Sequence, residues 1–213
     1  MNRHLPILYI FRDFRWVVAS VKSPKYNYTN QIAKAYDISV PKLKKIMEPY
    51  KSKFHRWVIW EKEFWKSLST AIGKTTPEEV KNIFHQDPNT YAVLHKSIIK
   101  FTKKLQTLWY ISIVLSDVFA PKKKLLQKNW RYNGFDDVLL SCDIWLCKYD
   151  DRRNYTTTTF AYAIKKYKIQ PEAVIYIDDK KGNCTLAKML GCKTIVAKTS
   201  TQVIKDIKNI LKI

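Results

Sequence analysis

The chain has 213 residues, of which 46% are apolar and 14% aromatic, and its net charge is +21. This composition supplies a packed core and excludes a disordered chain. No run of 18 or more apolar residues is present, so no membrane span is expected. The apolar run near the N-terminus is too short for a secretory signal, and the four cysteines lack zinc-site spacing. We therefore expect reduced thiols in a cytoplasmic protein.

The excess of lysine and arginine is spread over both halves of the chain and does not form a basic tail. A charge of this size attracts polyanions and would make any binding to nucleic acid strongly dependent on salt. A nucleic acid or another polyanion is therefore one expected partner. The richness in lysine, isoleucine, asparagine and tyrosine could instead reflect coding bias alone.

The first predicted element is a buried strand over residues 6–11, which runs directly into Arg12 and Asp13. Helical spacing of apolar residues then extends from about residue 20 to residue 108. Helices are expected over residues 31–36, 39–50, 57–72, 76–84 and 91–105, the fourth with a capping box at Thr76-Pro-Glu-Glu79. The aromatic residues at this spacing are more typical of a helical core than of a stacking surface for nucleic acid.

Strand patterns return after residue 108. Strands are expected over residues 108–115, 138–141, 173–178 and 193–197, and helices over residues 122–132, 157–167, 185–190 and 201–212. Strands that alternate with helices predict a parallel sheet with right-handed crossovers. The helical module lies between the first strand and the second.

Two adjacent carboxylates, Asp178 and Asp179, end the apolar strand that begins at Ala173. A Gly-Asn turn and a short helix are expected to follow them. A buried strand that delivers an acidic pair to its carboxyl end is typical of metal and phosphate sites in open α/β sheets. The alternative is that the two carboxylates only cap a loop.

Four features occur together in the chain. They are a strand followed by a helical insertion, a strand ending in Ser116, Lys148 before Tyr-Asp-Asp, and Ile177-Asp-Asp with Asn183 four residues later. This combination resembles the haloacid dehalogenase (HAD) superfamily. The chain is most similar to members with a small helical cap after the first strand, such as sugar-phosphate phosphatases and the N-terminal domain of epoxide hydrolases.

The resemblance covers nearly the whole chain and implies a fold. Residues 1–19 and 109–213 would form an α/β core, a Rossmann-like three-layer sandwich with a parallel sheet. Residues 20–108 would form the inserted helical cap. The implied activity is Mg²⁺-dependent hydrolysis of a small phosphorylated substrate through an aspartyl nucleophile.

The resemblance also implies roles for single residues. Ser116 resembles the residue whose hydroxyl binds an oxygen of the transferring phosphoryl group. Asp117, which also belongs to this phosphate-binding segment, stands where asparagine is frequent in the family. Lys148 would neutralise the nucleophile and the phosphate. These roles are chemically sound, because a carboxylate that attacks a phosphate dianion needs cations to offset repulsion.

For the metal, the resemblance implies that Asp178 and Asp179 hold Mg²⁺ together with the nucleophile, and that Asp179 is the more direct ligand. Asn183 would brace the site. Hard oxygen ligands of this kind suit Mg²⁺.

The nucleophile motif departs from the family pattern. Aligned without a gap, the nucleophile position holds Arg12, which has no nucleophilic oxygen. Shifted by one residue, it holds Asp13, and Arg15 then replaces the second aspartate, the general acid/base. Trp16 replaces a small residue in a tight loop. Either guanidinium, of Arg12 or of Arg15, could bind phosphate and would repel a divalent cation.

Two functions therefore remain open. The first is a HAD-type phosphatase with Asp13 as nucleophile, possessing full or impaired activity. The second is a catalytically degenerate HAD-fold protein that binds an anionic or nucleic-acid partner without hydrolysis. The acidic pair favours the first, and the altered nucleophile loop favours the second. Fold-level analogy alone does not establish activity.

Overall fold

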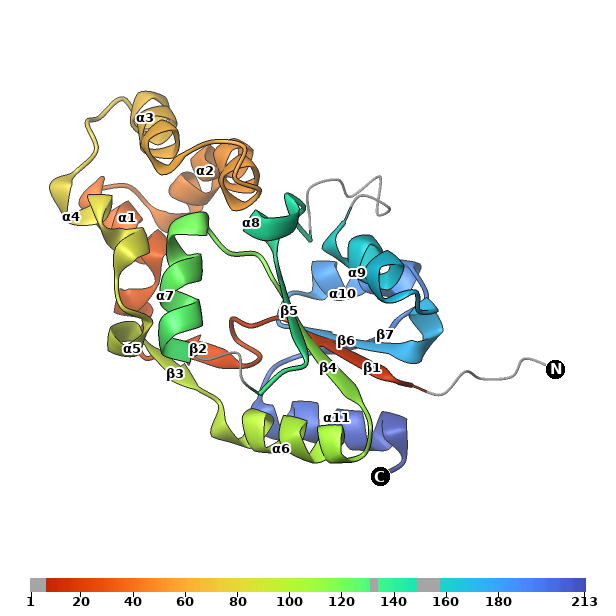
Figure 1. The fold of residues 1–213 in the computed structure, drawn as a ribbon. Helices are drawn as coiled ribbons and strands as arrows, with labels where there is room; N and C mark the ends of the chain where they lie inside the picture. The colour runs from red at the N-terminus through yellow and green to blue at the C-terminus, as the bar shows by residue number, and fades with distance from the viewer. Residues whose placement is uncertain (1–6, 131–133, 149–157) are drawn as a thin grey trace.

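In the computed structural model, which describes residues 7–130, 134–148 and 158–213, five parallel strands form the central sheet in the order β5-β4-β1-β6-β7 (Figure 1). The strands are β1 Tyr9–Arg12, β4 Ile111–Ser116, β5 Asp137–Leu140, β6 Val174–Asp178 and β7 Lys193–Val196. The first strand, β1, pairs with β4 on one side and with β6 on the other. The carboxyl ends of the three strands that carry predicted site residues are therefore neighbours.

Helices cover both faces of the sheet (Figure 1). On one face lie α6 Lys96–Thr107 and α11 Ser200–Leu211, and on the other lie α9 Thr159–Tyr167 and α10 Lys181–Met189. Two apolar clusters separate these helices from the sheet: Ile10, Val114 and Ile177 point to the first face, and Phe11, Leu115 and Tyr176 to the second. This three-layer α/β arrangement confirms the expected fold class.

A helical insertion, residues 22–91, lies beside the sheet and contains α1 Tyr28–Ala35, α2 Val40–His55, α3 Glu61–Ile72, α4 Glu78–Lys81 and α5 Pro88–Tyr91. It has an apolar cluster of its own, built on stacked rings such as Phe54 and Phe64, whose centroids are 4.7 Å apart. Phe119, just before α7 Ala120–Trp130, joins this cluster. Apolar packing therefore connects the insertion to the segment that follows β4.

The chain enters and leaves the insertion through two short antiparallel strands, β2 Ala19–Val21 and β3 Ala92–Leu94. Apolar spacing predicts a helix over residues 91–105, but residues 92–94 pair with β2 and the helix begins at Lys96. The apolar run around Val93 fits the spacing of a helix and that of a strand, and pairing with the distant strand β2 makes it a strand. A final short helix, α8 Ser141–Ile144, follows β5.

Three further details differ from the sequence expectations. The helix α6 lies within the expected cap boundary of 20–108, but its buried face packs into the cluster on the sheet. Thr76 does not cap α4; its hydroxyl interacts with Ser69 and Tyr36 instead. Gly182 and Asn183 lie in the first turn of α10 and not in a turn before it.

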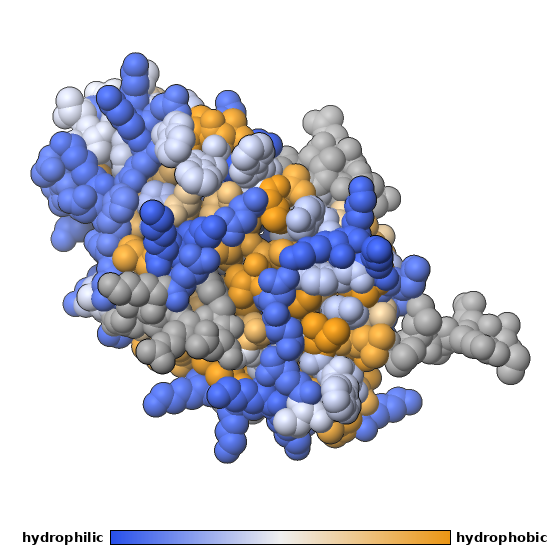
Figure 2. All heavy atoms as spheres, viewed as in Figure 1, coloured by the Kyte–Doolittle hydropathy of each residue, from blue (hydrophilic) through white to orange (hydrophobic). Residues whose placement is uncertain are grey.

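Figure 2 shows hydrophilic side chains over both the insertion and the sheet-containing core, in keeping with the even spread of charge along the sequence. All four cysteines are free and buried. Across the described residues, no helix has both the length and the apolar character needed to cross a membrane.

Candidate active site

Alternation along β1 determines which of two adjacent residues faces the candidate site. Successive side chains of a strand point to opposite faces. Arg12 lies two residues after Ile10 and so points to the same face of the sheet, toward α6. There its Nη1 donates to Thr102 Oγ1 at 2.6 Å. Asp13 lies two residues after Phe11 and so points to the opposite face from Arg12. Its backbone N–H extends the pairing of β1 with β6 by donating to Ile177 O at 2.8 Å. The structure therefore places Asp13, and not Arg12, beside the acidic residues of β6.

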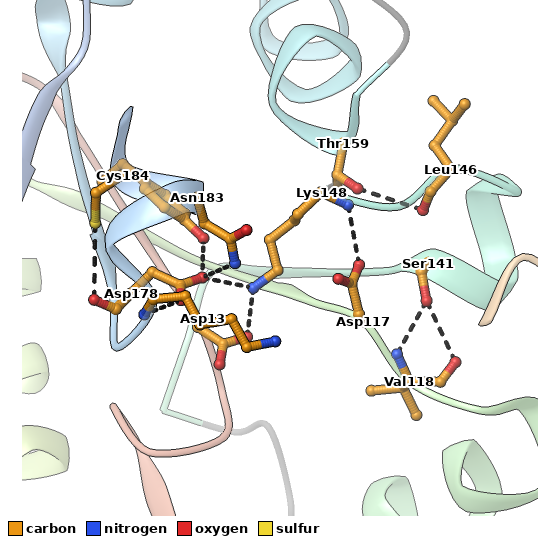
Figure 3. Close-up of polar contacts among 12 residues, drawn as sticks. Asp13, Asp117, Val118, Ser141, Leu146, Lys148, Thr159, Asp178, Asn183 and Cys184 are labelled. Carbon is orange, nitrogen blue, oxygen red and sulfur yellow. Dashed lines mark hydrogen bonds and ion pairs between the residues drawn. The ribbon is translucent and has the colours of Figure 1, made fainter. Parts of the chain in front are cut away.

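Lys148 joins the two carboxylates at the centre of the site. Its Nζ lies 2.5 Å from Asp13 Oδ1 and 2.9 Å from Asp178 Oδ2 (Figure 3). All three side chains are almost completely buried. Lys148 comes from the segment after α8, so residues from three distant parts of the chain meet here. Residues 149–151, whose Tyr-Asp-Asp sequence supports the family resemblance, lie outside the described residues.

The carboxylate of Asp178 is held in place by several donors. Asn183 Nδ2 donates to Asp178 Oδ2 at 3.0 Å, and the hydroxyl of Tyr176 donates to the same oxygen. The other oxygen, Oδ1, accepts from the backbone N–H of Lys180 at 2.8 Å. With Lys148, four donors therefore fix this carboxylate. Tyr176 was not singled out in the sequence, although its position two residues before Asp178 on one strand places both on the same face.

Burial and the charge of neighbouring side chains shift the pKa values of Asp13, Asp178 and Lys148 in opposite directions. Burial raises the pKa of Asp13, Lys148 opposes this, and the nearby Asp178 carboxylate raises it further. For Asp178, burial acts to raise the pKa, but Lys148 and the hydrogen bonds from Tyr176 and Asn183 outweigh it and lower the pKa. Lys148 has a raised pKa because its three carboxylate neighbours outweigh burial. The ammonium is therefore charged at neutral pH.

Asp179 completes a group of three carboxylates. One oxygen from each of Asp13, Asp178 and Asp179 lies within 4.8 Å of the others. Burial, followed by the charge of Asp178, raises the pKa of Asp179. Converging carboxylates of this kind favour a bound cation, and their hard oxygen atoms fit Mg²⁺.

Ser116 and Asp117 follow one another at the end of β4, and both line the cavity described below. Asp117 Oδ1 accepts from the backbone N–H of Lys148 at 3.2 Å. Its Oδ2 is buried and has no hydrogen-bond partner among the described residues. Asp117 therefore ties the Lys148 segment to β4 while one of its oxygens stays available to a ligand.

Arg15 and Trp16 occupy the loop after Asp13. The guanidinium carbon Cζ of Arg15 lies 5.3 Å from the centroid of the Tyr28 ring and 5.7 Å from that of Trp16. Trp16 has a φ of 70°, a left-handed conformation that glycine adopts without strain. Within the described part of the chain, neither Arg12 nor Arg15 forms an ion pair with the three carboxylates. The Arg12 side chain therefore points away from the three carboxylates, whereas Arg15 lines the same cavity as Asp13 and Asp179.

A cavity of about 170 Å³ lies between the sheet and the insertion and brings these residues together. Six of its lining residues are candidate site residues predicted from the sequence: Asp13, Arg15, Ser116, Asp117, Lys148 and Asp179. The sequence did not mark other lining residues that carry an ionisable group, which include Tyr28, Lys51, His55, Tyr91, Lys122 and Lys180. The missed residues are mostly contributed by the insertion, where no motif marks them.

A second group of possible metal ligands, His55, Asp117 and Cys147, has ligand atoms within 4.8 Å of one another. The ring of His55 packs against Phe119 with a centroid distance of 4.1 Å. Burial, with the surrounding lysines, lowers the pKa of His55 well below its ordinary value, so the imidazole is neutral at neutral pH. This group joins α2 of the insertion to the core beside the cavity.

Comparison with solved structures identifies the fold. A HAD-like family hydrolase from Porphyromonas gingivalis matches with a TM-score of 0.68 and 19% identity, over 98% of this chain and 100% of that one. A HAD family enzyme from Bacteroides thetaiotaomicron, in complex with magnesium and inorganic phosphate, matches with a TM-score of 0.65 and 18% identity, over 90% and 94%. An L-2-haloacid dehalogenase matches with a TM-score of 0.61 and 9% identity, over 98% and 100%.

The chain therefore has the HAD-like fold that its sequence predicts. No family model and no curated relative matches the sequence. At these identities the comparison defines the fold, and the activity has to be argued from the site.

Proposed function

We propose that this protein is a Mg²⁺-dependent HAD-type phosphatase that acts on a small phosphorylated metabolite, with Asp13 as the nucleophile. The observation that carries the proposal is the position of Asp13 on the wall of the cavity, with the ammonium of Lys148 2.5 Å from its carboxylate. A carboxylate and a phosphate dianion repel each other, and a buried cation beside the nucleophile offsets that repulsion.

In this reaction a carboxylate oxygen of Asp13 attacks phosphorus and the bond to the leaving oxygen breaks, which gives an aspartyl phosphate. Water then hydrolyses the aspartyl phosphate and regenerates Asp13. Ser116, at the end of β4, would donate its hydroxyl to a phosphoryl oxygen. Asp178, held by four donors, would keep the ammonium of Lys148 in place throughout.

Asp13 and Asp179 are the residues that would hold Mg²⁺ most directly, because both oxygens of Asp178 already accept hydrogen bonds. The ion would supply positive charge that offsets the repulsion of the nucleophile for the phosphoryl group. The fit rests on the convergence of three carboxylates within 4.8 Å.

Phosphate is favoured over a carbon–halogen substrate by the charges around the cavity, which include Arg15, Lys122 and Lys148. Attack on a carbon–halogen bond creates much less charge repulsion and has less need of these cations. The cavity volume of about 170 Å³ suits a compact metabolite and not a polymer. Free cysteine thiols are typical of the cytoplasm, which is the location we propose.

One observation favours a second candidate function. Arg15 stands where the family places its general acid/base, and a guanidinium stays protonated at neutral pH. The loop therefore offers no second carboxylate to protonate a leaving group. In the second candidate, the chain binds a phosphorylated or polyanionic partner, nucleic acid included, without hydrolysis.

The first test is hydrolysis of p-nitrophenyl phosphate with and without Mg²⁺. We expect Mg²⁺-dependent turnover by the wild type and a loss of at least about 10³-fold in kcat/KM for Asp13→Asn. Asp143→Asn, which removes a carboxylate paired with Lys123 on α7, is the matched control and should retain activity. Background rates for the wild type, together with retained phosphate binding, would favour the second candidate.

The role of position 15 is tested with leaving groups of different basicity. A nitrophenolate leaves without a proton, whereas an alkoxide needs one. Arg15→Asp should therefore raise the rate with glycerol 2-phosphate about 10-fold or more and change the rate with the aryl ester much less. An equal effect on both esters would contradict the assignment of position 15 to proton transfer.

A further inference from the structure

Two cations that line the cavity, Arg15 and Lys122, face the same aromatic ring of the insertion. Arg15 lies with its Cζ 5.3 Å from the centroid of Tyr28, and Lys122 Nζ lies 5.8 Å from the same centroid. Lys122 also lies 4.9 Å from the centroid of Tyr91 and donates to its hydroxyl at 3.4 Å. These two cations come from different segments, the loop after β1 and the helix α7, and both line the cavity.

Neither cation has a carboxylate partner within the described ranges. The ion pairs found within the described ranges involve other basic side chains, such as Lys123 on the same helix as Lys122, which pairs with Asp143. The carboxylates that line the cavity are Asp13, Asp117 and Asp179, and Lys148 contacts the first two. Two cations held near one another without a counter-charge carry an electrostatic cost that an anion would remove.

The ionisation of Lys122 is consistent with this arrangement. Burial, followed by the charge of Arg15, lowers the pKa of Lys122 to about 8. An anion bound between the two side chains would raise that pKa again. The aromatic rings around them hold the cations in place through cation–π contacts but add no negative charge.

We propose that Arg15 and Lys122 form a second anion-binding subsite, so that the substrate carries another anionic group a few bonds from its scissile phosphoryl group. A carboxylate or a second phosphate fits, because a guanidinium and an ammonium both donate charge-assisted hydrogen bonds to such oxygens. The inference rests on the proposed phosphatase function for the identity of the first group. It assigns the phosphoryl group to Asp13, Ser116 and Lys148, and the second anion to the insertion side of the cavity.

The test compares two ligands that differ in the second group alone: 3-phosphoglycerate, which has a carboxylate, and glycerol 3-phosphate, which has a hydroxymethyl group. Binding is measured by calorimetry on the Asp13→Asn protein with Mg²⁺, so that no turnover is required. We expect 3-phosphoglycerate to bind at least about 10-fold more tightly. Lys122→Met should remove most of that preference, and Lys122→Arg should restore it.

The matched control is Lys124→Met, which removes an exposed lysine from the same helix α7. It should leave both affinities unchanged. Equal affinity for the two ligands, no binding of either at millimolar concentration, or an equal loss of both in Lys122→Met would overturn the subsite. Circular dichroism of each variant confirms that the fold is retained.

The two proposals fail in different ways. Selective binding of 3-phosphoglycerate by a protein that hydrolyses no phosphate ester would leave the subsite standing and reject the phosphatase. Hydrolysis of both esters with equal kcat/KM would leave the phosphatase standing and reject the subsite.

Discussion

At the scale of single residues, the parity of β1 separates two neighbours that the sequence alone left undecided. No turn residue follows the apolar run before Arg12, so the sequence allows either Arg12 or Asp13 at the nucleophile position. Ile10 and Phe11 pack on opposite faces of the sheet, which fixes the direction of the residues that follow. As a result, Asp13 faces Lys148. The expectation that Arg12 binds phosphate does not agree with this placement, because its side chain points toward α6.

Arg12 is a nearly unpaired buried cation, and we expect it to cost stability. Its Nε and Nη2 have no hydrogen-bond partner among the described residues, and burial lowers its pKa to about 9 in spite of Asp136. Replacing even a buried ion pair by apolar side chains of similar volume is often stabilising by about 1–4 kcal/mol, and a cation without an ion-pair partner has less attraction to lose. Arg12→Met should therefore raise the free energy of unfolding, measured by urea denaturation, and leave phosphatase activity unchanged.

Thr102→Val provides the comparison, because it removes the acceptor of the Arg12 Nη1 donor. It should destabilise the wild type by about 1–3 kcal/mol and the Arg12→Met protein by much less. A loss of phosphate binding in a folded Arg12→Met protein would show that this guanidinium does reach the site.

At the scale of elements, side chains connect the last turn of α9 to the start of β5. Asp137 Oδ2 accepts from Lys166 Nζ at 2.7 Å and from Tyr167 Oη at 2.6 Å. Burial acts to raise the pKa of Asp137, but these hydrogen bonds outweigh it and lower the pKa from its ordinary value. The ionised form therefore stabilises the fold at pH values above the unfolded pKa, and this contribution is lost as pH falls through the folded pKa.

Asp137→Asn should accordingly destabilise the protein at pH 7 and have a smaller effect near pH 3. The expected difference at pH 7 is about 1 kcal/mol, because the pair with Lys166 is partly exposed and such pairs are weak. Urea denaturation of the wild type and the variant at both pH values measures it, with Tyr167→Phe as a milder change at the same contact. A difference that stays constant from pH 7 to pH 3 would contradict this account.

The elements themselves were largely predictable because strong periodicity marks them. The alternating pattern of strands and helices after residue 108 predicted the parallel sheet, and the structure confirms the fold class. The predictions of secondary structure that were wrong involve contacts between residues far apart in the sequence. Val93 lies in β3 because β2 is available as a partner, and the hydroxyl of Thr76 bonds to other helices instead of capping its own. Local sequence carries no signal for such contacts.

At the scale of the whole molecule, the site combines residues from both sequence halves, and only part of it carries motifs. Asp178, Asp179 and Asn183 belong to one contiguous pattern, so the sequence located them. Lys122 on α7 and Tyr28 on α1 of the insertion belong to no such motif, because tertiary packing of the insertion against the core brings them together. Substrate recognition was therefore outside the reach of sequence reasoning, while the expected roles of the motif residues stay predictions.

Metal binding should be visible in the stability of the molecule. Three converging carboxylates repel one another, so Mg²⁺ should raise Tm by binding the folded state, with a gain of about 2.7 kcal/mol at 100 times the dissociation constant. Asp179→Asn should abolish most of this shift, and Asp143→Asn should retain it. An unchanged shift in Asp179→Asn would mean that Mg²⁺ binds elsewhere.

The pairing of β2 with β3 also bears on how quickly the chain can find its native topology. Tyr9 pairs with Ile111 across about 100 residues of intervening chain, and closing so long a loop is entropically costly. Because Ala19 lies opposite Leu94, an insertion that has already folded shortens that loop about fourfold. By the logarithmic dependence of loop entropy, this saves about 1.2 kcal/mol. The helical insertion can therefore act as a folding accelerator for the sheet, quite apart from what it binds.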